Sequence, residues 1–149
     1  LLGSMLKTSF LPQKLNGISI ATPRNQSGGH CIPVDPYYLI QKALDVGIPA
    51  ELITAARAVS RTMPLHVAQI VTELLWKTGV HADEAKVLFL GWSYKANVGD
   101  PRETPALLIF ESLKSKGITV GSWDPHMNYT KFPDEVIPIG SIEDARVMI

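Results

Sequence analysis

The segment from Gly28 to Pro36 holds the residues best suited to covalent chemistry. Cys31, the single cysteine among the 149 residues, follows two glycines, and Asp35 lies four positions after it. Glycine allows a backbone to approach a ligand closely, and a thiolate near a helix start in a polar loop can act as a nucleophile. Asp35 could then order a water molecule or a base. The alternative is that the cysteine is a small buried hydrophobic residue.

A second polar segment, residues 91–104, is predicted to join the carboxyl end of a strand to the start of a helix. In open α/β sheets, ligands bind in the crevice at that position. Lys95 and Arg102 could bind phosphates there, and Tyr94 or Trp92 could stack on a base. The sequence has neither G-x-G-x-x-G nor G-x-x-x-x-G-K-[ST], and the alternative is an ordinary solvated loop.

The remaining polar residues predict no metal site. No two of the four histidines have the spacing of metal ligands, and Cys31 has no second thiolate beside it. Arg57 and Arg61 lie four residues apart on a predicted helix, where we expect a solvated face; alternatively they reach an anionic ligand held by a second chain. On the same helix, we expect His66 and Trp76 to have structural roles in packing.

Composition excludes several classes of protein. Lys and Arg number 14, as do Asp and Glu, so no net field attracts nucleic acid or an anionic membrane. Hydrophobic residues make up 46% and charged residues 19%, which is typical of a packed globular chain. One cysteine excludes an internal disulfide. We find no apolar run long enough to span a bilayer and no basic leader, so we expect a cytoplasmic protein.

Two predicted helices fill the region after Pro36. The first runs to Gly47, and the second occupies residues 51–79, where Pro64 either kinks it or begins another helix. Apolar residues recur along the second helix in steps of three and four, which predicts one apolar face. They are Leu52, Ala56, Val59, Met63, Val67, Ile70 and Leu74.

The pattern changes to strand–helix–strand after Ala85. Residues 86–91 and 118–123 are short apolar runs typical of buried strands, and a helix over residues 105–116, capped by Thr104, separates them. Such a unit forms a right-handed crossover on a parallel sheet. We expect a third strand at 136–139, a helical turn at 141–145 and the start of a strand at 147–149.

Together the two motifs resemble those of the nucleotide-sugar dehydrogenases, the UDP-glucose/GDP-mannose 6-dehydrogenase family. Residues 28–39, Gly-Gly-His-Cys-Ile-Pro-Val-Asp-Pro-Tyr-Tyr-Leu, are similar to its catalytic-cysteine motif, and closest to the branch acting on UDP-N-acetyl-hexosamines. Residues 94–105 resemble its second signature, which opens a C-terminal UDP-binding domain. Trp123-Asp124-Pro125 resembles the strand end that follows.

The resemblance implies a reaction and roles for the matching residues. The family oxidises the C6 alcohol of a UDP-sugar to a carboxylate in two hydride transfers to NAD. Cys31 would trap the aldehyde as a thiohemiacetal that becomes a thioester, and Asp35 would position or activate the hydrolytic water. The implied substrate-binding residues are Thr22, Gly28, Gly29, Tyr94 and Lys95. The implied NAD-binding residues are Cys31, Ile32, Pro33, Val34 and Arg102.

The resemblance also implies a domain organisation. Residues 1–35 would be an irregular segment with the cysteine loop, residues 36–84 a helical dimerisation domain, and residues 85–149 a truncated UDP-binding domain. The fold class is therefore α/β, with a helical central segment before an incomplete Rossmann-like parallel sheet. We expect a homodimer through the 52–74 face. Since no NAD-binding glycine motif is present, we expect no turnover by this chain alone; the alternative is a non-catalytic UDP-binding or dimerisation module.

Overall fold

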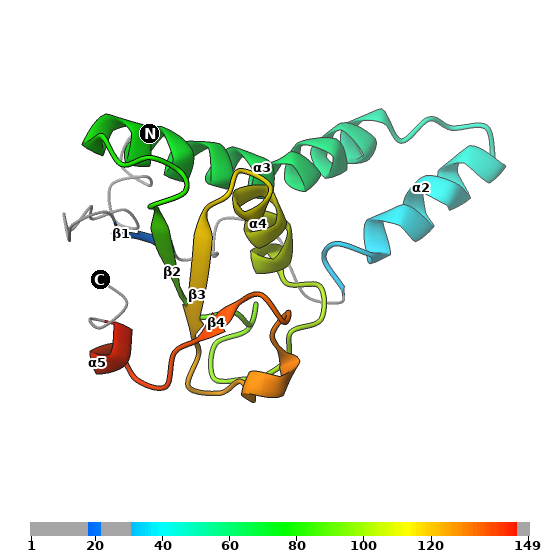
Figure 1. Ribbon diagram of the computed structural model, residues 1–149. Coiled ribbons are helices and arrows are strands. Elements are labelled where there is room, and N and C mark those ends of the chain that lie inside the picture. The colour runs from blue at the N-terminus through cyan, green and yellow to red at the C-terminus, as the bar shows by residue number, and fades with distance from the viewer. Residues whose placement is uncertain (1–17, 22–30, 146–149) are drawn as a thin grey trace, which may run out of the picture.

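A four-stranded parallel sheet forms the centre of the computed structural model, which describes residues 18–21 and 31–145 (Figure 1). Its strands lie side by side in chain order. Leu88 of the second strand pairs in register with Ile20 on one side and Gly121 on the other. The strands are β1 (Ile18–Ala21), β2 (Lys86–Leu90), β3 (Thr119–Trp123) and β4 (Ile137–Pro138). The predicted α/β fold and the strands predicted at 86–91, 118–123 and 136–139 are confirmed, and β1 lies within the segment expected to be irregular. The strand start expected at 147–149 lies outside the described residues.

Helices connect the strands and cover one face of the sheet. The long α3 (Glu51–Thr78) precedes β2, and α4 (Pro105–Lys114) joins β2 to β3. Both helices share one apolar cluster with Val87 and Phe89 of β2. Alternate residues of a strand point to opposite faces, and accordingly Leu88 and Leu90 belong to a second, smaller cluster with Trp123 and Ile139. The other helices are α2 (Asp35–Asp45), the 3-10 helix η1 (Tyr129–Lys131) and α5 (Ile142–Ala145).

The start of α4 follows the sequence prediction closely. Thr104 is the N-cap, and its side-chain oxygen accepts a hydrogen bond from the N–H of Ala106. Pro105 occupies the first helical position, where its missing N–H is not needed. The Thr104 hydroxyl also donates to the carbonyl of Trp92, so the cap joins the helix to the loop that precedes it.

Helix α3 is continuous through Pro64, and only part of its predicted apolar face is packed within the chain. The buried apolar residues lie in its second half, whereas Leu52 and Val59 are 83% and 64% exposed. Of the predicted apolar face, Leu52 and Val59 thus lie outside the packed half, because the sheet and α4 cover only the second half of the helix; the homodimer expected through this face stays a prediction. Trp76, expected in the core, is 80% exposed because it points away from its buried neighbour Leu75. His66 is exposed as well. The buried apolar residues are Pro64, Val67, Ala68, Val71 and Leu75.

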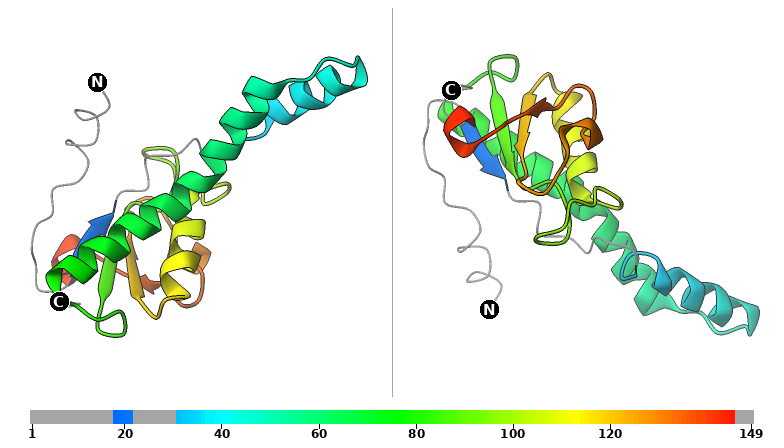
Figure 2. Two further views of the ribbon diagram at one scale, coloured as in Figure 1. Left: turned by 90° about the horizontal axis from the view of Figure 1, so that it is seen from above. Right: turned by 90° about the horizontal axis from the view of Figure 1, so that it is seen from below.

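The first half of α3 and α2 together project beyond the sheet, and we call α2 with residues 51–63 the arm (Figure 2). No residue of α2 is buried. Arg57 of α3 holds the helix pair together, since its guanidinium carbon lies 5.5 Å from the centre of the Tyr37 ring. The prediction of a solvated Arg57 is wrong because α2 covers it; Arg61 is exposed.

Candidate functional site

A cavity of about 330 Å³ opens where β2 and β3 end. Parallel strands place their carboxyl ends at one edge of the sheet, and Leu90 and Trp123 are paired at that edge. Residues 91–104 start there, as the sequence predicted. Tyr94 is half-buried and Lys95 is exposed. The cavity is lined by Leu90, Gly91, Ser93, Tyr94, Lys95, Ala96, Asn97, Trp123, Asp124, Pro125 and His126.

Asp124 connects the two loops that surround this cavity. Its Oδ2 atom accepts hydrogen bonds from the N–H groups of Trp92 at 2.9 Å and Ser93 at 3.0 Å. Its Oδ1 atom accepts one from the N–H of His126 at 2.9 Å. Burial acts to raise the pKa of Asp124, but these backbone hydrogen bonds outweigh it and hold that pKa below its usual value. The carboxylate is therefore ionised at neutral pH, and both of its oxygens accept backbone hydrogen bonds.

A close backbone contact joins the same two loops at a second point. A methyl group placed on Gly99 would lie 1.9 Å from the carbonyl oxygen of His126. Only glycine allows the two backbone segments to approach this closely. The Lys131 ammonium donates to the carbonyl of Gly99 at 3.3 Å. The shape of the cavity therefore depends on contacts between chain segments that are far apart in sequence.

Trp92 belongs to the core rather than to the site. It is 1% exposed, so the proposal that it stacks on a base is wrong. Its ring centre lies 5.9 Å from that of Phe89, 6.2 Å from that of Phe110 and 5.4 Å from that of Phe132. These aromatic contacts hold the start of the loop in place. Of the two aromatic residues predicted to stack on a base, Tyr94 alone lines the cavity.

Arg102 lies outside the cavity lining, in the exposed part of the same loop. Its Nη2 atom lies 2.7 Å from Oδ2 of Asp100, and its Nε atom donates to Oδ1 at 2.9 Å. This hydrogen bond and the charge of Asp100 raise the pKa of Arg102. The guanidinium is thus held in a fixed orientation while 70% of the side chain remains exposed.

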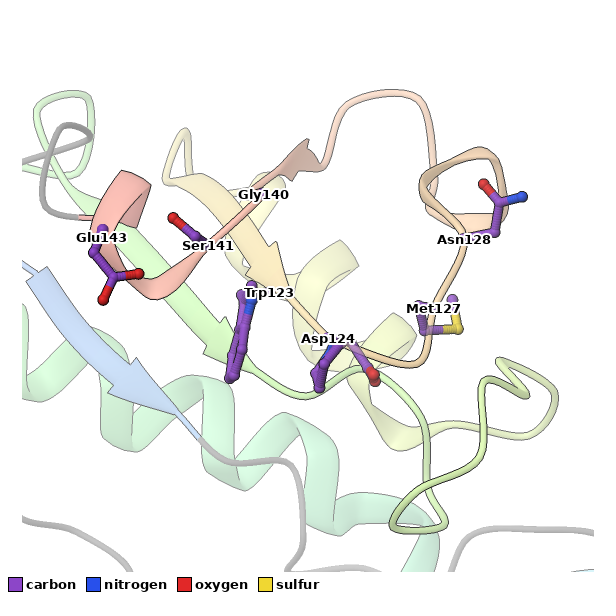
Figure 3. Close-up of a pocket in the computed structure, with 8 residues that line it drawn as sticks. Trp123, Asp124, Met127, Asn128, Gly140, Ser141 and Glu143 are labelled. Carbon is purple, nitrogen blue, oxygen red and sulfur yellow. The ribbon is translucent and has the colours of Figure 1, made fainter.

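A second cavity, of about 530 Å³, lies on the other side of the end of β3 (Figure 3). Trp123, Asp124 and Pro125 line both cavities. Figure 3 shows Trp123 at the end of β3, Ser141 on the segment that leads into α5, and Glu143 on α5 itself. Sequence reasoning missed Trp123, Asp124 and His126 as lining residues. A carboxylate directly after a buried strand, next to a second strand end, is a signal that could have identified Asp124.

Cys31 lies in a turn directly before α2. Its carbonyl accepts hydrogen bonds from the N–H groups of Val34 at 3.0 Å and Asp35 at 2.8 Å. Cys31 and Asp35 are exposed, and neither of the two cavities includes them. Figures 1 and 2 place the start of α2 on the same side of the molecule as residues 91–104. Three predicted substrate-binding residues, Thr22, Gly28 and Gly29, lie outside the described residues.

The described residues near Cys31 and Arg102 have the chemistry expected for part of a NAD site. Ile32 and Val34 expose apolar side chains beside the thiol, and a nicotinamide ring can pack against such a surface. The oriented guanidinium of Arg102 suits a phosphate. Within the residues that the structure describes, no group of three or more His, Cys, Asp or Glu side chains could hold a metal ion. No described helix is long and apolar enough to cross a membrane.

Two sequence models of one family match this chain. The UDP-binding domain of the UDP-glucose/GDP-mannose dehydrogenase family matches residues 88–145, and the central domain of the same family matches residues 11–62. The first match contains the cavity at the strand ends, and the second contains Cys31 and most of the arm.

Individual relatives agree with the family models. A UDP-N-acetyl-D-mannosamine dehydrogenase of Methanococcus maripaludis is 35% identical over 116 residues, which are 78% of this chain and 26% of the relative. A UDP-N-acetyl-D-glucosamine 6-dehydrogenase of Pseudomonas aeruginosa is 35% identical over 116 residues, covering 76% of this chain and 28% of the relative.

A solved structure supports the same relationship. The UDP-D-ManNAc dehydrogenase of Pyrococcus horikoshii superposes with a TM-score of 0.64 at 33% identity, over 73% of this chain and 25% of that one. This chain thus spans about a quarter of the length of the relatives it matches. From its two matched domains and its fold, the chain belongs to the UDP-glucose/GDP-mannose dehydrogenase family.

Proposed function

We propose that this chain carries the catalytic cysteine and the nucleotide-binding part of a NAD-dependent UDP-N-acetyl-hexosamine 6-dehydrogenase. One observation carries the proposal: Tyr94 and Lys95 line a cavity at the carboxyl ends of β2 and β3, within the matched UDP-binding domain. A lysine ammonium there can pair with a diphosphate, and a tyrosine ring can stack on the base. The relatives named for UDP-N-acetyl sugars support the substrate class.

In the proposed reaction, the C6 alcohol of the sugar is oxidised in two steps. The two hydrides that leave C6 pass to two molecules of NAD, which is the chemistry that this cofactor supplies. After the first oxidation, the Cys31 sulfur adds to the aldehyde carbon, and a C–S bond forms in a thiohemiacetal. The second oxidation yields a thioester at Cys31. Water, positioned by Asp35, then breaks the C–S bond and releases a carboxylate and the free thiol.

The rest of the NAD site must come from outside these 149 residues. The sequence holds no G-x-G-x-x-G motif, and hydride transfer needs a domain that binds the whole dinucleotide. Ile32, Pro33, Val34 and Arg102 would supply only one side of that site. We therefore expect this chain by itself to bind UDP without oxidising a UDP-sugar. A non-catalytic UDP-binding module is the alternative, favoured by the position of Cys31 outside both cavities.

The arm is the proposed dimerisation surface. It exposes several large apolar side chains, which a second copy of the chain would cover. The proposed interface lies at the Leu52–Val59 end of α3, because the second half of the helix already packs its buried residues, among them Val67 and Leu75, within the chain.

Binding of UDP tests the nucleotide site. Titration calorimetry of this chain with UDP should give a measurable heat, and Lys95→Ala should weaken binding by about 1–3 kcal/mol, the range of a charge-assisted hydrogen bond. Lys77→Ala is the matched control, because Lys77 is exposed in the last turn of α3, which leads to the amino end of β2. It should leave the affinity unchanged.

Two outcomes would contradict the proposal. Absence of heat and of any thermal shift at millimolar UDP would show that this chain has no nucleotide site. An equal loss in Lys95→Ala and Lys77→Ala would show that the lysine acts through the overall charge of the chain and not through the cavity.

A further inference from the structure

The carboxylate of Asp124 is hydrogen-bonded to the backbone of the two loops around the nucleotide cavity. The residue is 7% exposed, and both of its oxygens accept backbone N–H groups: Trp92 and Ser93 on one side, His126 on the other. Buried carboxylates in such a position are stabilised by those donors. Asp124 therefore interacts with the chain that forms the cavity, although it also lines the cavity wall.

Its location is unusual for a site that would hold a diphosphate. An unpaired carboxylate would repel the phosphates and oppose binding. Here three N–H dipoles point at the carboxylate, and Lys95, Tyr94 and His126 come from the loops around it. On the side of the second cavity, Glu143 is the other charged residue of the lining. Loss of the Asp124 charge would remove its repulsion of the phosphates. A purely electrostatic account thus predicts tighter UDP binding without that charge.

The hydrogen bonds of Asp124 predict the opposite effect, which is weaker UDP binding when its carboxylate is lost. Tyr94 and Lys95 directly follow Ser93, whose N–H group is fixed by Asp124. The same carboxylate fixes the N–H of His126 on the facing loop. Gly99 and the His126 carbonyl make the second contact between these loops. The Asp124 side chain thus links the two walls of the cavity directly, beside the backbone contact at Gly99.

We propose that Asp124 is the positioning residue of the nucleotide cavity, which holds Tyr94 and Lys95 in place for UDP without contacting it. The proposal rests on the proposed function of that cavity. In this proposal the backbone around the cavity is already ordered in the folded chain. UDP binding therefore does not have to order it, and the affinity is higher.

Asp124→Asn tests the proposal, because asparagine keeps the size of the side chain but retains one acceptor oxygen instead of two. It can accept from one loop only, and its NH₂ group faces the N–H donors of the other. We expect the dissociation constant for UDP to rise about tenfold or more, as for loss of charge-assisted hydrogen bonds. Calorimetry at neutral pH on the wild-type and variant chains measures the change.

A second variant separates positioning from loss of stability. Ile109→Val removes a methyl group from the core side of α4, where Ile109 is buried away from the cavity lining. It should lower the melting temperature and leave UDP affinity unchanged. If Ile109→Val weakens UDP binding as much as Asp124→Asn does, Asp124 acts through stability alone and the proposal is wrong.

Amide hydrogen exchange of the wild-type chain supplies a measurement that does not depend on the variant folding. The amides of Trp92, Ser93 and His126 should be protected before UDP is added, and UDP should shift the signals of Tyr94 and Lys95. Rapid exchange of the three amides in the free chain would overturn the proposal. If the wild type binds UDP and a folded Asp124→Asn chain binds it equally well, only this proposal fails; if the wild type does not bind UDP, the proposed function fails with it.

Discussion

Gly99 occupies a position that no larger residue can take without movement of the backbone. The Cβ atom of any other residue would overlap the His126 carbonyl oxygen at 1.9 Å, and a carbonyl in a loop held by Asp124 cannot move away freely. The contact joins a loop of mostly exposed residues to the segment that follows β3.

We expect Gly99→Ala to separate the two loops and to lower both stability and UDP affinity. The loss of stability should be about 1–3 kcal/mol, the usual cost of overpacking, measured by thermal or chemical unfolding. Gly117→Ala is the matched control: its φ of +82° makes alanine unfavourable, but no atom lies within 4 Å of the added carbon. That variant should lose about 1–2 kcal/mol of stability and keep its UDP affinity; an equal loss of affinity would refute the role of the contact.

Single residues were the hardest part of the molecule to predict. The residue types and their spacing were enough to place Tyr94 and Lys95 on a loop at a strand end, because that position depends only on the neighbouring sequence. The burial of Trp92 and Arg57 depends on segments distant in sequence: three phenylalanines surround the first, and Tyr37 of α2 covers the second. A local sequence pattern does not show which distant residues will become neighbours in the fold.

At the scale of elements, the start of α4 joins the core to the site. Thr104 caps the helix, and its hydroxyl also donates to the Trp92 carbonyl. That carbonyl belongs to the same peptide group as the Ser93 N–H that donates to Asp124. Helix, core and loop therefore meet at one buried hydroxyl.

Thr104→Val, which keeps the shape of the side chain, should destabilise the chain by about 1–3 kcal/mol, because the cap and a buried hydrogen bond are both lost. Unfolding in denaturant gives the value. Thr62→Val is the control, since the Thr62 hydroxyl donates only to the Val59 carbonyl on an exposed stretch of α3, and a change within about 0.5 kcal/mol is expected. Equal effects of the two substitutions would refute a special role for Thr104.

Elements with strong local signals were predictable from the sequence. Strands β2 and β3 are short apolar runs between turns, and α4 has a cap, a proline and a following glycine, so local rules were sufficient. The buried face of α3 was not predictable in the same way. Its apolar residues run along the whole helix, but the sheet and α4 cover only residues from Pro64 onward.

At the scale of the whole molecule, the arm has little packing against the other described residues. No residue of α2 is buried, and its large apolar residues are exposed to the solvent. The core, in contrast, is concentrated between the sheet and the second half of α3. These exposed apolar side chains are the surface that the proposed homodimer would cover.

We expect a homodimer in sedimentation velocity experiments and a monomer after Leu52→Glu, which places a charge on the exposed end of α3. Burial of an unpaired carboxylate in an interface is strongly unfavourable. Trp76→Glu is the control, because Trp76 is equally exposed but lies at the other end of the helix. A wild-type monomer would contradict the proposal, and dissociation by Trp76→Glu alone would move the interface away from the arm.

Pro64 marks the boundary between the packed half of α3 and the arm. A proline cannot donate the hydrogen bond that would normally reach the carbonyl four residues earlier, so the helix resists bending least at this point. Pro64 therefore places the missing backbone hydrogen bond of α3 where the packed half of the helix meets the arm.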